Sequence, residues 1–148
     1  MSTVVDFHSH VLPKLDDGSR SVEESLAMLQ LSRAQGVEEI ILTPHFYPQQ
    51  HNPEHFLAQR RQSLEQLCSA SGPEMAVPAL RLGAEVYYYP HMSHSAVLEQ
   101  FAFEGTRTLL VEMPMGTWTD RMYRELEDIY HNLGLMPIVA HVDRYLGT

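Results

Sequence analysis

Short apolar segments alternate with helical segments along the chain, and this alternation constrains the fold most. Continuous apolar or β-branched runs, typical of strands in a covered parallel sheet, occur near residues 4–8, 40–43, 80–88, 108–111 and 137–140. Helical patterns lie between them, at 22–35, 53–70, 95–101 and 119–133. Connections of these lengths suit parallel crossovers. The sequence therefore predicts a single α/β domain over residues 1–148, with about five parallel strands and helices outside.

Capping signals mark several helix boundaries. Ser21 and Glu24 form a capping box in which each side chain can satisfy a free backbone N–H of the first turn. Gly36 suits the position just after a helix, and Pro53 suits a first turn. Cys68 falls on the apolar stripe of the helix at 53–70, so we expect it in the core.

Composition excludes several classes of protein. The formal net charge is −9, which does not suit a protein that binds a nucleic-acid backbone. No apolar run approaches the roughly 20 residues that span a bilayer, so no membrane insertion is expected. The first residues show neither a basic nor an apolar leader segment, and the single cysteine rules out an internal disulfide. Cytoplasmic localisation is the resulting expectation.

The segment from Asp6 to Gly18 is rich in metal-ligand chemistry. His8 and His10 project from the same side of an extended chain, because side chains of a strand repeat every second residue. Asp16 and Asp17 follow on a loop that ends at Gly18. Imidazole and carboxylate groups are ligands of zinc, manganese and iron. The spacing leaves open which aspartate would be the ligand.

The other expected strands also deliver such side chains at or just beyond their carboxyl ends. In a parallel β/α sheet or barrel these ends emerge on one face, where such folds build their sites. The sequence therefore predicts one metal site assembled from five strands, with these side chains: His8, His10, His45, Glu85, Glu112 and His141.

Other histidines and aromatic residues fit ordinary structural roles better. The histidines in loops or on helices are expected to be solvated or hydrogen-bonded: His51, His55, His91, His94 and His131. The segment from Phe46 to Asn52 is expected to form a loop over the site. Tyr87, Tyr88 and Tyr89 suit strand packing and rim cover, with stacking on an aromatic substrate as the alternative.

The motifs together resemble a known family. Asp6-Phe7-His8-Ser9-His10 with Asp16-Asp17-Gly18 is similar to the opening of the polymerase-and-histidinol-phosphatase (PHP) superfamily. Further similar motifs follow in the same order over the whole chain: Thr43-Pro44-His45, Gly83-Ala84-Glu85, Leu110-Val111-Glu112 and Ala140-His141-Val142-Asp143-Arg144. Within PHP, the set resembles the bacterial CpsB/CapC-type protein-tyrosine phosphatases of capsule and exopolysaccharide synthesis.

The resemblance implies a distorted, TIM-like β/α barrel with a manganese-dependent trinuclear site; the ligand types also admit iron or zinc. It implies Asp17 as the loop ligand and Asp16 as the less favoured choice. The implied metal ligands are His8, His10, Asp17, His45, Glu85, Glu112 and His141. Arg144 would bind the phosphate, which agrees with the fit of a guanidinium fork to phosphate oxygens.

One family motif, of the Ser-Asp-Ala-His type, has no match here. We therefore expect an incomplete barrel that lacks its C-terminal part, and weak activity from residues 1–148 alone. Open sheet edges in such a barrel favour association into a homo-oligomer.

The expected function is hydrolysis of phosphotyrosine on a bacterial tyrosine kinase that controls polysaccharide synthesis. Two alternatives stay open. One is a PHP phosphoesterase for a small molecule, of the histidinol-phosphatase kind. The other is a catalytically weak relative that binds a metal or a partner.

Overall fold

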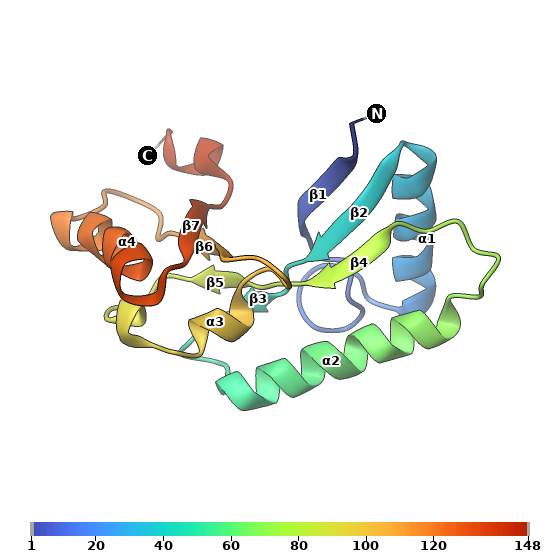
Figure 1. The fold of residues 1–148 in the computed structure, drawn as a ribbon, viewed down its shortest axis with the longest axis horizontal. Helices are drawn as coiled ribbons and strands as arrows, with labels where there is room; N and C mark the ends of the chain where they lie inside the picture. The colour runs from blue at the N-terminus through green and yellow to red at the C-terminus, as the bar shows by residue number, and fades with distance from the viewer. Residues whose placement is uncertain (1, 148) are drawn as a thin grey trace.

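The computed structural model describes residues 2–147, and its fold is a parallel α/β arrangement (Figure 1). The strands are β1 (Val4–Ser9), β2 (Val37–Leu42), β3 (His45–Phe46), β4 (Ala79–Leu82), β5 (Glu85–Tyr87), β6 (Thr108–Glu112) and β7 (Met136–Val139). The α-helices are α1 (Val22–Ala34), α2 (Pro53–Ala70), α3 (Leu98–Phe101) and α4 (Asp120–Leu133), and short 3₁₀ turns are η1 (Met92–His94) and η2 (Val142–Tyr145).

The strands form two parallel sheets, and two of the chain segments run from one sheet into the other. One sheet has the order β1-β2-β4 and the other β3-β5-β6-β7. Thr43-Pro44 separates β2 from β3, and Gly83-Ala84 separates β4 from β5. The Gly83 N–H still donates to the Leu42 carbonyl at 2.8 Å, and the Glu85 N–H to the Pro44 carbonyl at 2.9 Å. β2 and β3 are therefore two parts of one bent strand, and β4 and β5 are two parts of the next.

This bend reconciles the expected strands with those observed. The parallel α/β class is confirmed, and the strands follow one another across the sheets in chain order. The single strand expected at 80–88 is wrong in detail, because it is interrupted at Gly83-Ala84. The helix expected at 95–101 is shorter and begins at Leu98, after the η1 turn.

Each sheet has its own hydrophobic core, and α2 packs against both. Figure 1 shows α2 running beneath the two sheets, with α1 beside β2 and β4 and with α3 and α4 beside the other sheet. Phe56 of α2 lies in the core of the second sheet, which includes Phe46, Val86, Phe101, Leu109 and Val111. Leu67 of the same helix lies in the core of the first, with Val11, Leu12, Leu29, Ile40, Leu42 and Leu82. Burial of these side chains against one helix holds the two sheets together.

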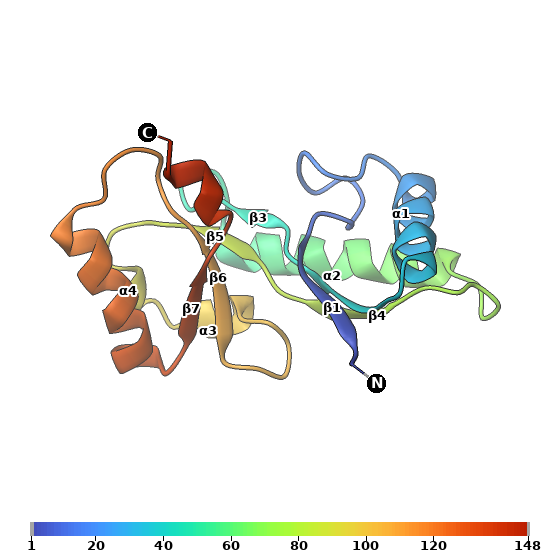
Figure 2. The ribbon, with the colours of Figure 1, turned by 90° about the horizontal axis from the view of Figure 1, so that it is seen from above.

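Two expectations about burial are wrong. Cys68 is exposed, because Leu67 rather than its neighbour takes the inward position of α2. Val4, Val5 and Phe7 of β1 are 51%, 41% and 48% exposed, because β1 is an edge strand. Figure 1 shows β1 at the border of its sheet, and in the view from above β1 crosses in front of β4 (Figure 2).

The N-cap at Ser21 is confirmed, the reciprocal contact expected of Glu24 is not formed, and Asn52 and Thr119 are two further N-caps that were not predicted. Ser21 accepts the Glu24 N–H at 3.0 Å, Asn52 accepts the His55 N–H at 3.1 Å, and Thr119 accepts the Met122 N–H at 3.3 Å. Each such cap contributes about 1 kcal/mol to helix stability. The Glu24 carboxylate accepts the N–H of Arg20 rather than that of Ser21, at 3.4 Å. Within residues 2–147, no helix combines the length and apolar character needed to cross a bilayer.

The bend at Gly83 leads to a stability prediction. A Cβ on Gly83 would lie 2.8 Å from Phe103 Cδ1 and 3.2 Å from Ile41 Cγ2. We expect Gly83→Ala to lower the free energy of unfolding by about 1–3 kcal/mol, because a buried overlap forces neighbours to shift. Gly72→Ala is the control, since a Cβ there meets nothing within 4 Å. Urea unfolding midpoints measure both variants, and an unchanged midpoint in Gly83→Ala would contradict this account of the bend.

Candidate metal centre

The centre of the site is Glu85, a carboxylate whose side chain is 1% exposed. It follows the Gly83-Ala84 bend and is the first residue of β5. One carboxylate oxygen, Oε2, lies 2.7 Å from His8 Nε2, 3.2 Å from His10 Nε2 and 3.6 Å from His45 Nδ1. The other, Oε1, lies 3.1 Å from His141 Nε2. Four histidines from different parts of the chain therefore converge on one buried acid.

The two histidines of the N-terminal motif point at one place. His8 belongs to β1 and His10 follows its end, as the alternation of side chains along a strand requires. Their Nε2 atoms are only 3.3 Å apart, and both approach the same oxygen of Glu85.

The C-terminal half contributes Glu112 and His141. Glu112 ends β6, and His141 follows β7 in a left-handed conformation with φ of 36°. His141 Nε2 lies 2.9 Å from Glu112 Oε2. The His141 ring centroid is 6.0 Å from that of His8, although β1 and β7 are the outer strands of the two sheets. The sheets therefore curl enough to bring their outer edges together at this point.

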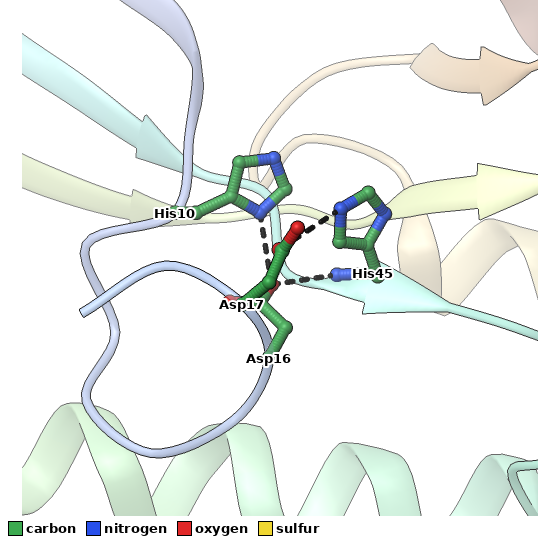
Figure 3. Close-up of side chains that lie close together, drawn as sticks. All are labelled: His10, Asp16, Asp17 and His45. Carbon is green, nitrogen blue, oxygen red and sulfur yellow. Dashed lines mark hydrogen bonds and ion pairs between the residues drawn. The ribbon is translucent and has the colours of Figure 1, made fainter. Parts of the chain in front are cut away.

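Two neighbouring aspartates contact the site in different ways (Figure 3). The Asp16 carboxylate accepts the N–H of Gly18 at 3.0 Å and of His45 at 3.1 Å, and it hydrogen-bonds His10 Nδ1 at 2.8 Å. The Asp17 side chain is 83% exposed, and its Oδ1 lies 3.4 Å from His45 Nε2. Asp16 is thus fully used in holding the loop and His10, whereas Asp17 reaches the site with an available carboxylate.

The histidines of the site compensate the negative charge of its buried carboxylates. Burial alone would lower the pKa of His10, but hydrogen bonds with Asp16 and Glu85 outweigh it and raise that pKa to about 10. Burial raises the pKa of Glu85, yet the contacts with His10 and His8 hold it well below its usual range. A proton on His10 therefore compensates the buried carboxylates, and a cation bound through His10 must displace that proton.

A tyrosine at the edge of the site feels the same charges. Burial, together with the carboxylates of Glu112, Glu85, Asp17 and Asp16, raises the pKa of Tyr47 to about 12. Its hydroxyl group therefore stays protonated at neutral pH. The Tyr47 ring stacks on His45, with centroids 5.1 Å apart and planes at 15°.

The donor groups fit divalent cations. Ligand atoms bound to one ion at about 2.1 Å are roughly 3 Å from each other, and the nitrogen–oxygen distances around Glu85 are 2.7–3.6 Å. His45 Nδ1, which lies 3.6 Å from Glu85 Oε2, is buried and has no hydrogen-bond partner among residues 2–147, as expected of a nitrogen near a ligand position. Three overlapping groups each have ligand atoms within 4.8 Å of one another: His10, Asp16, Asp17, His45; His8, His10, Glu85; and His45, Glu85, Glu112.

A cavity of about 280 Å³ opens over these groups. Arg144, on the η2 turn that follows His141, lines it and is exposed. The structure thus brings together all the site residues expected from sequence, which are His8, His10, Asp17, His45, Glu85, Glu112, His141 and Arg144. The orienting role of Asp16 and the stacking of Tyr47 were missed. For the role of Asp16, the signal in the sequence was a second carboxylate next to the candidate ligand Asp17.

The remaining histidines lie outside the three ligand groups found among residues 2–147. His51 Nδ1 accepts the N–H of Tyr47 at 2.9 Å, and His91 Nε2 lies 2.9 Å from Arg121 Nη2. The hydrogen-bonded roles expected for these two are confirmed.

The different contacts of Asp16 and Asp17 predict different effects of substitution. Asp17→Asn should lower Mn²⁺ affinity at least about tenfold and leave the stability of the metal-free chain unchanged, because Asp17 is exposed. Asp16→Asn should lower the metal-free stability by about 1–3 kcal/mol, because it weakens three hydrogen bonds. Calorimetric titration and thermal unfolding measure the two quantities. Wild-type affinity in Asp17→Asn would exclude it as a ligand.

Comparison with known proteins agrees with this arrangement. The family model for capsular polysaccharide synthesis proteins of the CpsB/CapC type matches residues 4–147. The tyrosine-protein phosphatase CpsB of Streptococcus pneumoniae is 29% identical over 144 residues, which cover 96% of this chain and 58% of that protein. The tyrosine-protein phosphatase YwqE of Bacillus subtilis is 28% identical over 145 residues, which cover 95% of this chain and 55% of YwqE.

Structure comparison gives the same result. A chain from the crystal structures of YwqE of Bacillus subtilis and CpsB of Streptococcus pneumoniae, described as metal-dependent tyrosine phosphatases, superposes with a TM-score of 0.80. It is 25% identical, and the match covers 95% of this chain and 56% of that one. The present chain thus spans between half and two thirds of the length of the relatives it matches. On the strength of a family match that extends over residues 4–147, the chain belongs to the CpsB/CapC family of capsular polysaccharide synthesis proteins.

Proposed function

We propose that this chain carries the metal centre of a phosphomonoester hydrolase that acts on phosphotyrosine in proteins. The observation that carries the proposal is the buried Glu85 carboxylate with four imidazoles around it and an arginine at the cavity rim. A site of this composition can hold cations and an anionic substrate at once. The relatives with which it shares fold and family are described as metal-dependent tyrosine phosphatases.

The donor set suits two or three divalent ions, with manganese as the proposed metal. His8, His10 and Glu85 would hold one ion, and His45 with Glu85 and Glu112 would hold another. Asp17 and His45 would bind an ion on the side of the loop that carries Asp17. Iron and zinc accept the same nitrogen and oxygen ligands. When bound, such ions polarise a phosphoryl group and lower the pKa of water towards neutrality.

The side chains of the chain itself orient the reactants. Asp16 holds His10 through Nδ1 at 2.8 Å, which leaves Nε2 directed at the centre. Arg144 makes no ion pair with another side chain in residues 2–147, so its guanidinium group is available to bind phosphate oxygens. Its charge would then oppose the negative charge that builds on the phosphoryl oxygens.

The physiological assignment follows from the family. We propose that the phosphotyrosine belongs to a bacterial tyrosine kinase that regulates capsule or exopolysaccharide synthesis, in the cytoplasm. The exposed apolar side chains of the edge strand β1 favour association with another copy of the chain.

Metal binding through the histidine motif can be tested directly. His8→Ala should retain less than about a tenth of the wild-type Mn²⁺ content after dialysis, because it removes a ligand beside Glu85. His131→Ala is the matched control, since His131 lies on α4 outside the ligand groups of residues 2–147. Elemental analysis gives the metal content. Equal content in both variants, or a wild type without metal, would overturn the metal centre.

The role of Arg144 predicts a loss of rate without a loss of metal. In a chain that also contains the family's Ser-Asp-Ala-His motif, Arg144→Ala should lower kcat/KM for a phosphotyrosine peptide by about 30- to 1000-fold, which corresponds to about 2–4 kcal/mol of transition-state stabilisation. Manganese content should be unchanged, because a guanidinium group cannot coordinate a cation.

Arg33→Ala, at an exposed position of α1, controls for loss of one positive charge. A parallel loss of metal and rate in Arg144→Ala would make this arginine structural. Faster turnover of small alkyl phosphates than of phosphopeptides by the wild type would instead favour a small-molecule phosphoesterase.

A further inference from the structure

A tyrosine follows each of His45 and Glu85 by two residues: Tyr47 comes directly after the end of β3, and Tyr87 is the last residue of β5. β3 and β5 run parallel, and His45 is the register partner of Glu85. Side chains two residues apart on extended chain share a face, so Tyr47 and Tyr87 lie on the ligand side, one step closer to the strand ends. Their ring centroids are 5.9 Å apart with planes at 50°. The two rings therefore form one layer directly beyond the layer of metal-competent side chains.

The ring of Tyr47 is held in place from two directions. It stacks on His45 at 5.1 Å, and His45 stacks in turn on His10 at 4.4 Å. Its backbone N–H donates to His51 Nδ1 at 2.9 Å, and its carbonyl accepts the N–H groups of Gln50 and His51, each at 2.9 Å. A side chain fixed before a ligand arrives loses little conformational entropy on binding.

Tyr47 and Tyr87 are more exposed than the core residue Tyr88. Tyr88, between Tyr87 and Tyr89, is 8% exposed and packs in the core of the second sheet. Tyr47 and Tyr87 are only half-buried; Tyr47 stacks on His45 of the site, and Tyr87 contacts Tyr47. Tyr47 stacks on His45, whose ring nitrogens lie 3.6 Å from Glu85 Oε2 and 3.4 Å from Asp17 Oδ1. A phosphate ester held over these carboxylates would thus have its organic group within reach of the pair.

We propose that Tyr47 and Tyr87 form an aryl wall, a pair of rings that contacts the aromatic group of a bound phosphate ester and selects aryl over alkyl phosphates. The inference rests on the proposed phosphatase function and assigns the part of the site that recognises the tyrosine ring. An offset or edge-to-face contact between aromatic rings changes affinity by about two- to tenfold. The wall supplies this contact to a phenyl ester, and a methyl ester receives none of it.

Binding of two non-hydrolysable phosphonates tests the aryl wall without turnover. The Mn²⁺-loaded chain is titrated calorimetrically with phenylphosphonate and with methylphosphonate, and the ratio of the two dissociation constants is compared between variants. Wild type should prefer phenylphosphonate. Tyr47→Leu and Tyr87→Leu should each lower that preference by about three- to tenfold. Tyr47→Phe should keep it, because the ring is retained.

Two controls make the result decisive. Tyr130→Leu removes an exposed tyrosine of α4 and should leave the preference unchanged. Manganese content is measured for every variant, because Tyr47 also packs on His45. If Tyr47→Leu loses manganese or fails to fold, the result for Tyr87→Leu decides.

The failures are distinguishable. A wild type that binds both phosphonates with an unchanged preference in the leucine variants would overturn the aryl wall and leave the proposed function in place. A manganese-loaded wild type that binds neither phosphonate would overturn both.

Discussion

The burial of one carboxylate governs the arrangement of this protein. Glu85 has lost nearly all contact with water, and an isolated buried carboxylate is unfavourable by several kcal/mol unless positive or hydrogen-bonding groups compensate it. Four imidazoles supply that compensation. Each comes from a different strand or strand end, except for the His8 and His10 pair. Ionic and hydrogen-bonding contacts with a single group at the start of β5 therefore tie both sheets together.

The bend in the two middle strands makes this convergence possible. A straight strand through Gly83 would place Glu85 in one continuous sheet. The bend instead moves Glu85 and His45 into the second sheet with the register unchanged: Leu42 pairs with Leu82 before the bend, and His45 pairs with Glu85 after it. Phe103 and Ile41 fill the space beside the missing Cβ of Gly83. Local packing at a glycine and the chemistry of the metal centre are thus consequences of the same backbone feature.

The organisation of the site also separates two tasks that look alike in sequence. The Asp16 carboxylate forms hydrogen bonds with His10, Gly18 and His45. It therefore supports the site and orients the His10 imidazole. Asp17 accepts no backbone hydrogen bond of this kind among the described residues, and its side chain is exposed. An orienting carboxylate beside a histidine is common at metal centres, because it fixes which ring nitrogen faces the ion. Asp16 also accepts the backbone N–H of His45, and the Tyr47 ring stacks on His45. The hydrogen bond to Asp16 therefore helps to fix the position of Tyr47.

Sequence alone determined the parallel α/β class, the N-cap at Ser21 and the convergence of strand-end histidines on Glu85, because periodicity and capping are local properties. It did not determine the bend at Gly83, the exposure of Cys68 or the exposure of β1. Those depend on which residue of a helix faces the core and on what covers an edge strand. It also left Asp16 and Asp17 unresolved, since adjacent carboxylates have the same chemistry. Only the tertiary structure gave them different contacts, because it places Asp16 against three hydrogen-bond donors and leaves Asp17 exposed beside His45.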